Sequence, residues 1–196
     1  MNTFYIARHG ETEGNRDKRL SGWLDTPLTD TGLDPTTEVL TKLAGIQIDE
    51  IYSSDIGRAF ITTYVISRGL NFTEEIQRLA GLREMNYGDA AHMYIDDAYK
   101  QYEGLGKNTQ FAPPNGESFE QMRERALATV GRLNDNHEDA NILLVCHSGV
   151  MAAIKSNFTG TQNIDAHRIS ADFPHDFVAR FTYEDGRVAS FEELTN

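Results

Sequence analysis

Three short runs with a strand pattern most constrain the fold of this chain: the nearly all-apolar TFYIA at residues 3–7 and NILLVC at 141–146, and the more polar IDEIYSS at 48–54. Runs of this length, rich in β-branched and aromatic residues, are typical of strands that are covered on both faces, as in a parallel sheet. Helical patterns alternate with these runs, and such alternation predicts a parallel sheet between two layers of helices. We therefore expect an α/β fold, a three-layer α/β/α sandwich with a mostly parallel sheet.

Capping patterns predict where four helices begin. The helices are expected to start near Pro35, Asp55, Ser118 and Ser148. Asp34 is the expected N-cap of the first helix, with a proline in its first turn, and Asp55 is the expected N-cap of the second. Ser118 and Gln121 form a capping-box pattern, and Gly160 is the expected end of the fourth helix.

Two segments depart from the strand-helix alternation. FVARFTY and RVASFEE flank the turn residues Glu-Asp-Gly, which predicts an antiparallel hairpin added at a sheet edge. Residues 89–117 contain IDDAYKQYEG and then KNTQFAPPNG, a pattern that favours a small cap inserted between sheet elements. The chain has 196 residues and no linker or internal repeat, so we expect a single domain over residues 1–196.

Composition and charge disfavour several classes of function. The formal net charge is −12, whereas a protein that binds nucleic acid or an anionic membrane needs an extended basic face. No apolar run approaches the ~20 residues that a spanning helix needs, and we expect a cytoplasmic location. Cys146 is the single cysteine, and the histidines lack metal-ligand spacing, so neither a disulfide nor a metal site is expected.

Polar side chains gather where the predicted strands end. Arg8 and His9 follow the first strand, Arg58 lies just inside the helix after the second, and His147 follows the third. Ligands of an open parallel sheet bind beyond the carboxyl ends of its strands, so these four side chains are expected to meet at one edge. Paired arginine donors and helix N-termini suit a phosphoryl group.

A histidine within such an anion site can attack phosphorus. Neutral imidazole is a competent nucleophile, and a covalent phosphoryl intermediate divides one difficult displacement into two easier steps. His9 is the expected nucleophile, and His147 is the expected donor to the developing charge. The leaving alkoxide also needs a proton, for which Glu84 is the candidate and Asp89 the alternative.

The motifs that contain these residues carry a resemblance to a known family. RHGET, then SGWLDTPLTDTG, SSDIGRA, LREMNYGD, NGES and LLVCHSG occur in the order seen in the histidine phosphatase superfamily, in its phosphoglycerate mutase-like group. The resemblance implies that His9 is phosphorylated, that Arg8, Arg58 and His147 hold the phosphoryl oxygens, and that no metal or organic cofactor is required. It also implies that Glu84 is the proton donor.

Further residues are expected to contact the substrate or its phosphate. They are Asn15, Ser21, Gly22 and Ser148. Asn15 matches a phosphate-contacting residue of the family, with a purely local role in a turn as the alternative. Ser21 and Gly22 have an ordinary turn as their alternative. The expected partner is a small phosphorylated substrate.

Two departures from the family pattern favour hydrolysis over mutase chemistry. The mutases follow the catalytic glutamate with an arginine that grips the substrate, whereas Met85 follows Glu84 here, and a thioether cannot bind an anion. A mutase must also retain a bisphosphorylated intermediate, yet residues 89–117 contain only Lys100 and Lys107 as lysines or arginines. We expect metal-independent hydrolysis of a small phosphomonoester; a cofactor-dependent phosphoglycerate mutase and a phosphate-recognition module without turnover are the alternatives.

Overall fold

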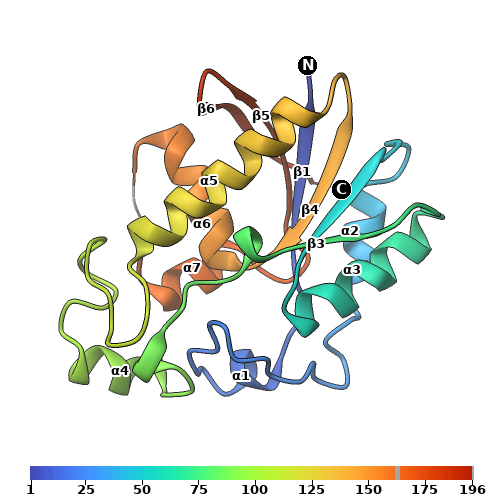
Figure 1. Cartoon of the computed structure of the whole chain (residues 1–196). Helices are drawn as coiled ribbons and strands as arrows, with labels where there is room; N and C mark the ends of the chain where they lie inside the picture. The colour runs from blue at the N-terminus through green and yellow to red at the C-terminus, as the bar shows by residue number, and fades with distance from the viewer. Residues whose placement is uncertain (162–163, 196) are drawn as a thin grey trace.

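The computed structural model describes residues 1–161 and 164–195, which are built around a six-stranded sheet (Figure 1). The strands are β1 (Thr3–Arg8), β2 (Glu50–Ser54), β3 (Gln77–Leu79), β4 (Asn141–Cys146), β5 (Val178–Glu184) and β6 (Arg187–Glu193). Their order in the sheet is β3-β2-β4-β1-β5-β6. The first four strands pair in parallel, and β5 pairs antiparallel with β1 and with β6. The predicted mostly parallel sheet is confirmed.

Helices cover both faces of this sheet. The α-helices are α1 (Glu13–Arg16), α2 (Thr36–Lys42), α3 (Gly57–Gly69), α4 (Ile95–Gln101), α5 (Phe119–Asn136), α6 (Ser148–Thr159) and α7 (Ala166–Asp172), and two short 3-10 helices are η1 (Ala80–Leu82) and η2 (Gly88–Ala90). Side chains of α5 and α6 pack on one face and side chains of α2 and α3 on the other. The three-layer arrangement is therefore confirmed.

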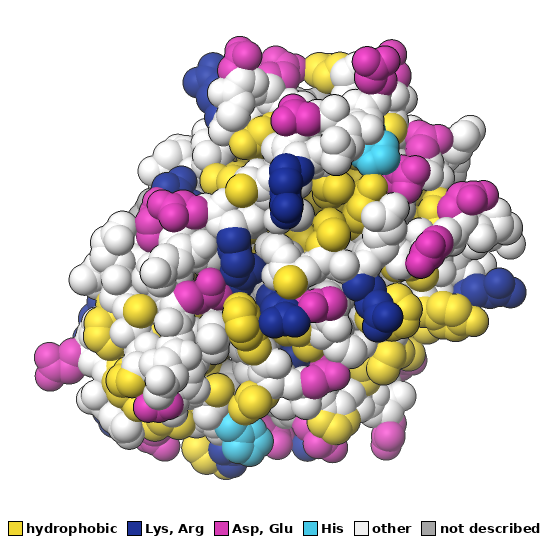
Figure 2. Space-filling model, viewed as in Figure 1, with side chains coloured by type: hydrophobic (Ala, Val, Ile, Leu, Met, Phe, Trp, Pro, Cys, Tyr) yellow, Lys and Arg dark blue, Asp and Glu magenta, His cyan; other side chains and the backbone are white. Residues whose placement is uncertain are grey.

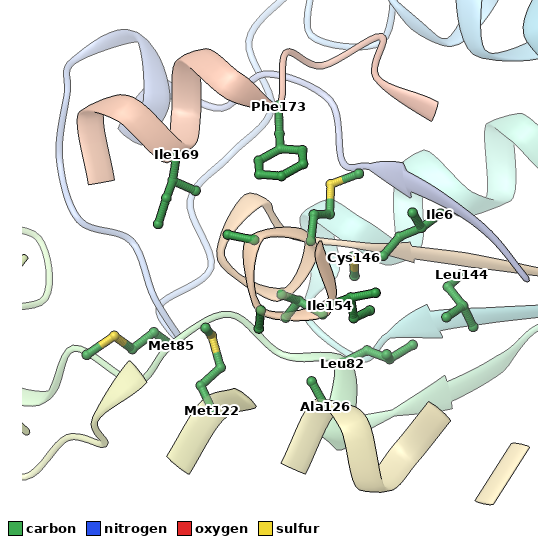
Figure 3. Close-up of a cluster of buried hydrophobic side chains, with 14 of the residues drawn as sticks. Ile6, Leu82, Met85, Met122, Ala126, Leu144, Cys146, Ile154, Ile169 and Phe173 are labelled. Carbon is green, nitrogen blue, oxygen red and sulfur yellow. The ribbon is translucent and has the colours of Figure 1, made fainter. Parts of the chain in front are cut away.

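The apolar runs are explained by the two buried faces. Successive side chains of a strand point to opposite faces, so Phe4 and Ile6 of β1 join the core beneath α5 and α6, while Tyr5 and Ala7 join the core beneath α2 and α3. Figure 3 shows the first of these cores, with side chains of β1 and β4 beside those of α5 and α6. A strand with polar residues on alternate positions would leave one of the two helical layers without a core.

Two of the predicted helix ends are confirmed. The backbone N–H of Gln121 donates to Ser118 Oγ at 3.2 Å, and the backbone N–H of Ser118 donates to Gln121 Oε1 at 2.8 Å, which completes the capping box of α5. Gly160 follows α6 with a φ of 71°, the left-handed conformation that glycine adopts readily. The first helix begins at Thr36 with Pro35 as its N-cap, so the prediction of Asp34 as N-cap is wrong.

The prediction that Asp55 caps the second helix is also wrong. Its carboxylate accepts hydrogen bonds from Nε and Nη2 of Arg83 at 2.7 and 2.6 Å, and Ile56 occupies the N-cap position of α3. Two charge-assisted hydrogen bonds to a guanidinium outweigh one bond to a backbone amide. Instead, Asp25 reaches in from a separate loop and accepts the backbone N–H of Arg58 at 3.1 Å.

The predicted hairpin lies at the sheet edge, as β5 and β6. Asp185 and Gly186 connect the strands with φ angles of 49° and 79°. Two consecutive residues with positive φ are typical of the tight turn that matches the twist of a hairpin. Because β5 runs antiparallel to β1, the chain entering β5 lies at the carboxyl end of β1.

The segment 89–117 is attached both to the core and to the chain after α1. Tyr99, Tyr102 and Phe111 pack against the core beneath α5 and α6, so these aromatic rings attach the segment to the main core. Backbone hydrogen bonds join the segment to residues 18–20. The N–H of Leu20 donates to the Met93 carbonyl at 3.0 Å, and the N–H of Ile95 donates to the Lys18 carbonyl at 3.0 Å.

On the face shown in Figure 2, lysine and arginine side chains lie among acidic, apolar and uncharged side chains and form no extended basic surface. Among the described residues, no helix is long and apolar enough to cross a membrane.

Candidate active site

The predicted site residues meet at one pocket beyond the carboxyl ends of the parallel strands. The pocket has a volume of about 410 Å³, and eight of the predicted residues line it: Arg8, His9, Asn15, Ser21, Gly22, Arg58, Glu84 and Ser148. His147 lies beneath this lining and is fully buried. Asp89, the alternative proton donor, is exposed and accepts a hydrogen bond from Asn115 Nδ2 at 2.9 Å, away from the pocket.

Parallel pairing of β1 with β4 brings the two histidines together. Arg8 lies opposite Cys146 in the register, and the backbone N–H of His9 donates to the Cys146 carbonyl at 3.0 Å. The rings of His9 and His147 are consequently 5.0 Å apart between centroids, edge to face. Two residues that are distant in sequence therefore meet because each follows directly after one of two neighbouring parallel strands.

The hydrogen bonds of His9 define its tautomer. Nδ1 lies 2.7 Å from the Gly10 carbonyl, which can only accept, so Nδ1 carries the proton. Nε2 then keeps its lone pair and accepts a hydrogen bond from Nε of Arg58 at 3.4 Å. Gly10 is required next to this ring, because a Cβ there would lie 2.2 Å from the Gly32 carbonyl oxygen.

Both histidines are held neutral. Burial lowers the pKa of His9 well below its usual value, and the nearby positive charge of Arg58 lowers it further. Burial and the charge of Arg58 lower the pKa of His147 in the same way. Near neutral pH the Nε2 of His9 therefore carries a free electron pair, which a nucleophile needs.

Arg58 joins the loop after α1 to the paired histidines. Its Nη1 donates to the Leu24 carbonyl at 2.8 Å, and its Nη2 donates to the Gly22 carbonyl at 2.7 Å. Nη2 also lies 3.2 Å from Nδ1 of His147, which must accept, so Nε2 of His147 donates to Ser54 Oγ at 2.9 Å. His147 thus contacts the pocket through Arg58, whose guanidinium it orients. Both of its ring nitrogens are already bonded and it does not line the pocket, so the predicted direct donation from His147 to the phosphoryl oxygens is not present in this arrangement of the described residues.

Arg8 is held from the other side of the pocket. Its Nη1 donates to the carbonyls of Phe173 and Ser170 at 2.5 and 3.2 Å, and its Nη2 donates to Ser170 Oγ at 3.3 Å. Burial lowers its pKa to about 10, so the guanidinium stays charged near neutral pH. Its buried Nε–H has no acceptor within residues 1–161 and 164–195, which leaves that donor available to an anionic ligand.

The side chain of Glu84 reaches the N-terminus of α6 from the loop after η1. Its Oε2 accepts the backbone N–H of Gly149 at 3.0 Å, and its Oε1 accepts the backbone N–H of Met85 at 2.8 Å. The carboxyl group thus lines the pocket beside the predicted nucleophile and can reach a leaving group held there. An acid that acts on the leaving oxygen must lie within hydrogen-bonding reach of it.

Asn15 and Gly22 have clear local roles as well as their place in the pocket. Asn15 Oδ1 accepts the backbone N–H of Thr12 at 3.1 Å, and this capping box of α1 fixes the orientation of the amide. Gly22 has a φ of 55°, and a Cβ there would lie 2.7 Å from the Met85 carbonyl oxygen. Ser21 Oγ lies 3.3 Å from Thr26 Oγ1.

The known sequence pattern that matches this chain is that of the histidine phosphatase superfamily (branch 1), over residues 4–193. The chain belongs to this superfamily. Its similarity to individual relatives spans both phosphatases and mutases. Phosphoglycerate mutase-like protein 4 of Arabidopsis thaliana is 31% identical over 156 residues, which cover 76% of this chain and 67% of that protein. The adenosylcobalamin/alpha-ribazole phosphatase of Escherichia coli is 30% identical over 161 residues, which cover 80% of this chain and 78% of that protein.

Solved structures of the histidine phosphatase superfamily share this fold. YhfR of Bacillus stearothermophilus superposes with a TM-score of 0.80 at 28% sequence identity, over 96% of this chain and 94% of that chain. In the part of the chain that the structure describes, no group of three or more histidine, cysteine, aspartate or glutamate side chains is arranged to hold a metal ion.

Three further residues contribute to this site and were not predicted from the sequence. Ser54 accepts from His147, Ser170 contacts Arg8, and Nδ1 of His175 donates to the His9 carbonyl at 2.6 Å. Ser54 ends the second strand, where polar residues were already expected. The position of His175 could also have been predicted, because His175 lies just before the predicted antiparallel strand, which begins at the carboxyl end of β1. The position of Ser170 could not have been predicted, because no helix was predicted over residues 166–172.

Substitution of Gly149 by alanine is expected to impair the site without unfolding the protein. An added Cβ would lie 2.1 Å from Glu84 Oε1, the end of a flexible side chain, so the carboxyl group would move while the helix stays intact. We expect kcat for an alkyl phosphate to fall by ~10²-fold, the lower end of what general acid catalysis contributes. Phosphate release and thermal unfolding of Gly149→Ala measure the two effects.

The control is Gly131→Ala on α5, where an added Cβ would meet no atom closer than 3.5 Å. It should leave turnover unchanged. Equal losses in the two variants, or a cooperative unfolding transition lost only in Gly149→Ala, would contradict the expected displacement of Glu84.

The buried neutral histidines predict that the protein loses stability in weak acid. Burial lowers the pKa of His9 and His147 well below 6.5, and burial with the charge of Arg8 lowers that of His175 to about 4. Below pH 6.5 the unfolded chain takes up protons that the folded chain does not. The free energy of unfolding therefore decreases as the pH is lowered, by up to about 1.4 kcal/mol per pH unit for each histidine. Urea unfolding between pH 7.5 and 5 measures the slope. A free energy of unfolding that rises on acidification over this range would contradict it.

Proposed function

We propose that this member of the histidine phosphatase superfamily hydrolyses small phosphomonoesters through a phosphohistidine intermediate on His9, without a metal ion or an organic cofactor. The observation that carries the proposal is the tautomer of His9: the Nδ1 proton is bound by the Gly10 carbonyl, and Nε2 is unprotonated beside Arg58. A neutral imidazole with an unprotonated Nε2, whose one hydrogen bond is a long one from Nε of Arg58 among the described contacts, is suited to attack a phosphoryl group.

The proposed reaction has two displacements. In the first, His9 Nε2 forms a bond to phosphorus, the bond from phosphorus to the ester oxygen breaks, and the carboxyl group of Glu84 gives its proton to the leaving oxygen. In the second, water attacks the phosphohistidine, gives a proton to the Glu84 carboxylate, and releases inorganic phosphate and neutral His9. Arg8 and Arg58 hold the phosphoryl oxygens throughout, with His147 orienting Arg58.

Hydrolysis is favoured over mutase chemistry by the surroundings of Glu84. Met85, which stands where the mutases have an arginine, is buried in the core and offers no cation to a second anionic group. The relatives do not favour either activity, because one is named as a phosphatase and another as phosphoglycerate mutase-like at nearly the same identity. One observation favours the mutase alternative: Lys18 and Arg19 line the pocket and would attract a second phosphate or a carboxylate.

The proposal includes a single domain over residues 1–196, with residues 89–117 as a cap beside the pocket. Its support is that Ile95 lines the pocket while Tyr99 and Phe111 pack against the main core. A volume of about 410 Å³ suits a small phosphorylated substrate. A cytoplasmic location is also proposed; it is supported by Cys146, the single cysteine, which is buried and leaves the chain without an internal disulfide.

The test is inorganic phosphate release across a panel of sugar phosphates, nucleotides, phosphoglycerates and 4-nitrophenyl phosphate, with and without a chelator. Release that resists the chelator is expected. In parallel, conversion of 3-phosphoglycerate is coupled to enolase with and without bisphosphoglycerate. Product that depends on bisphosphoglycerate would replace hydrolysis by mutase activity, and tight phosphate binding without turnover of any substrate would replace it by a recognition module.

A further inference from the structure

The proposed proton donor lies on a stretch of chain without regular secondary structure. Residues 83–87, which we call the Glu84 loop, connect η1 to η2, so no helix or strand ladder of their own fixes them. Glu84 must nevertheless be placed to within a fraction of an ångström for its carboxyl group to meet a leaving oxygen. The groups that bind the backbone of this loop therefore determine where the donor lies.

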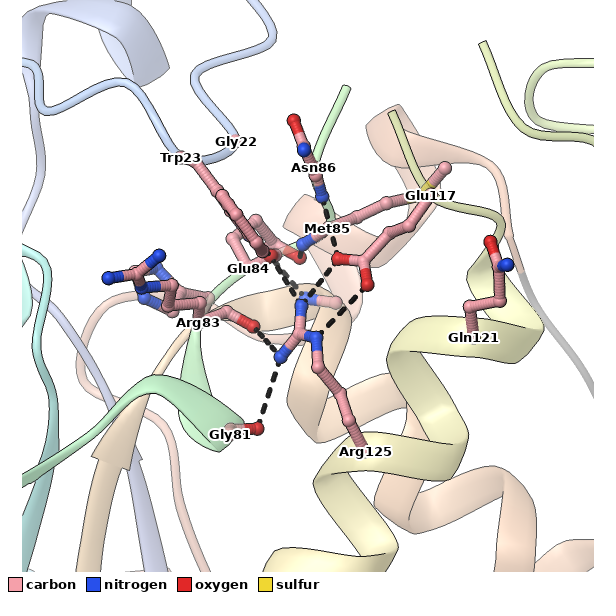
Figure 4. Close-up of polar contacts among 12 residues, drawn as sticks. Gly22, Trp23, Gly81, Arg83, Glu84, Met85, Asn86, Glu117, Gln121 and Arg125 are labelled. Atoms are coloured by element: carbon pink, nitrogen blue, oxygen red, sulfur yellow. Dashed lines mark hydrogen bonds and ion pairs between the residues drawn. The ribbon is translucent and has the colours of Figure 1, made fainter. Parts of the chain in front are cut away.

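Arg125, from the neighbouring helix α5, binds two carbonyls of this loop and one carbonyl of η1. Its Nη1 donates to the carbonyls of Gly81 and Arg83 at 3.1 and 2.7 Å, and its Nη2 donates to the carbonyl of Glu84 at 2.7 Å. Figure 4 shows the guanidinium extending from α5 into the curve of the loop. One planar, rigid group thus fixes three carbonyls at once, which a flexible ammonium group would not do.

Glu117 completes the arrangement. Its Oε2 and Oε1 accept from Nε and Nη2 of Arg125 at 3.0 and 2.6 Å, and Oε1 also accepts the backbone N–H of Asn86 at 2.8 Å. The pair is largely buried, with exposed side-chain fractions of 22% for Arg125 and 15% for Glu117. The loop is therefore held by a cation at its carbonyls and by an anion at an amide on the other side of Glu84.

We propose that Arg125, paired with Glu117, is a positioning residue for the proton donor: it sets the place of the Glu84 carboxyl group without touching the substrate. Arg125 does not line the active-site pocket, in keeping with this indirect role. The inference rests on the proposed function of Glu84. It predicts that loss of Arg125 reproduces the kinetic signature of losing the acid, because a displaced Glu84 protonates the leaving group poorly.

The test compares two aryl esters, 4-nitrophenyl phosphate and phenyl phosphate. Nitrophenolate leaves readily without a proton, whereas phenolate is more basic and depends on the acid. In Glu84→Gln, kcat/KM for phenyl phosphate, which reports the step in which the ester bond breaks, should fall by ~10-fold or more beyond the fall for 4-nitrophenyl phosphate. Arg125→Met should show the same disparity, and the double variant should lose little more than Glu84→Gln alone. Equal losses of Arg125→Met on both esters, or additive losses in the double variant, would overturn the proposal.

The chain offers a matched control on the same helix. Arg123 pairs with Glu120, and the exposed side-chain fractions of that pair, 24% and 16%, are close to those of Arg125 and Glu117. Arg123 makes no contact with the Glu84 loop among the described hydrogen bonds. Arg123→Met removes a similar ion pair from α5, so it should leave the ratio of the two esters unchanged.

A second measurement is independent of turnover. Trp23 is the single tryptophan, and its Nε1–H donates to the Glu84 carbonyl at 2.8 Å, so its fluorescence reports on the loop. Glu117→Ala, which leaves Arg125 in place, should increase quenching of Trp23 by acrylamide, and Arg123→Met should not. Unchanged quenching in Glu117→Ala would overturn the proposal even in an inactive protein. If Glu84→Gln showed no disparity between the esters while Glu117→Ala loosened Trp23, the donor role would fail instead.

Discussion

His9→Ala is expected to abolish phosphate release, with kcat lower by more than ~10⁴-fold, because no other group can form the covalent intermediate. Arg8, Arg58 and Glu84 keep their own bonds to the protein in this variant, so the anion site should persist. Calorimetric titration with inorganic phosphate should still detect binding. Retained binding together with lost turnover would separate loss of the nucleophile from loss of the fold.

The control for this substitution is His137→Ala. Nε2 of His137 is hydrogen-bonded to the Tyr52 hydroxyl at 2.8 Å, and the His137 carbonyl accepts from Nδ2 of Asn2, which precedes β1. His137 therefore lies toward the amino end of β1, away from the pocket, and its loss should leave turnover unchanged. Near-wild-type phosphate release by His9→Ala would contradict covalent catalysis by His9.

Arg58→Lys is expected to lower kcat/KM by ~10²–10³-fold, the range found when one donor to a developing anion is removed. Lysine keeps the charge but cannot donate in fixed directions to the carbonyls of Gly22 and Leu24 and to His147 at the same time. The loop after α1 should loosen, and the affinity for inorganic phosphate should fall with it. Steady-state kinetics and phosphate titration measure both losses.

Arg68 provides the comparison for this variant, since it lies on the same helix, α3, and is exposed. Arg68→Lys should behave as wild type. If Arg58→Lys retained wild-type kcat/KM, a positive charge alone would suffice at this position, and the geometric role given to its guanidinium would be wrong.

Much of the fold could be predicted because its determinants are local or periodic. Continuous apolar runs indicated strands buried on both faces, and the parallel pairing of β1 with β4 then placed His9 beside His147. The capping box of Ser118 and Gln121 was recognisable because all its groups lie within one helical turn. The prediction of Asp55 as a helix N-cap was wrong for the opposite reason, because its partner Arg83 is remote in sequence.

The supporting contacts of the site could not be predicted in the same way. Arg8 is held by carbonyl and hydroxyl groups of Ser170 and Phe173, whose position depends on how α7 packs and not on a local pattern. Arg125 likewise meets the Glu84 loop only because α5 packs against η1. Backbone carbonyls carry no sequence signature, so an arginine that binds them looks like any other surface arginine.

The most direct test of the account is to identify the phosphorylated residue during turnover. The enzyme is mixed with a good substrate, quenched in alkali within milliseconds to preserve phosphohistidine, digested and analysed by tandem mass spectrometry. We expect a phosphoryl group on Nε2 of His9 that forms and decays at least as fast as turnover and is absent from His9→Ala. Turnover without any phosphorylated His9, or with the phosphoryl group on another residue, would contradict it.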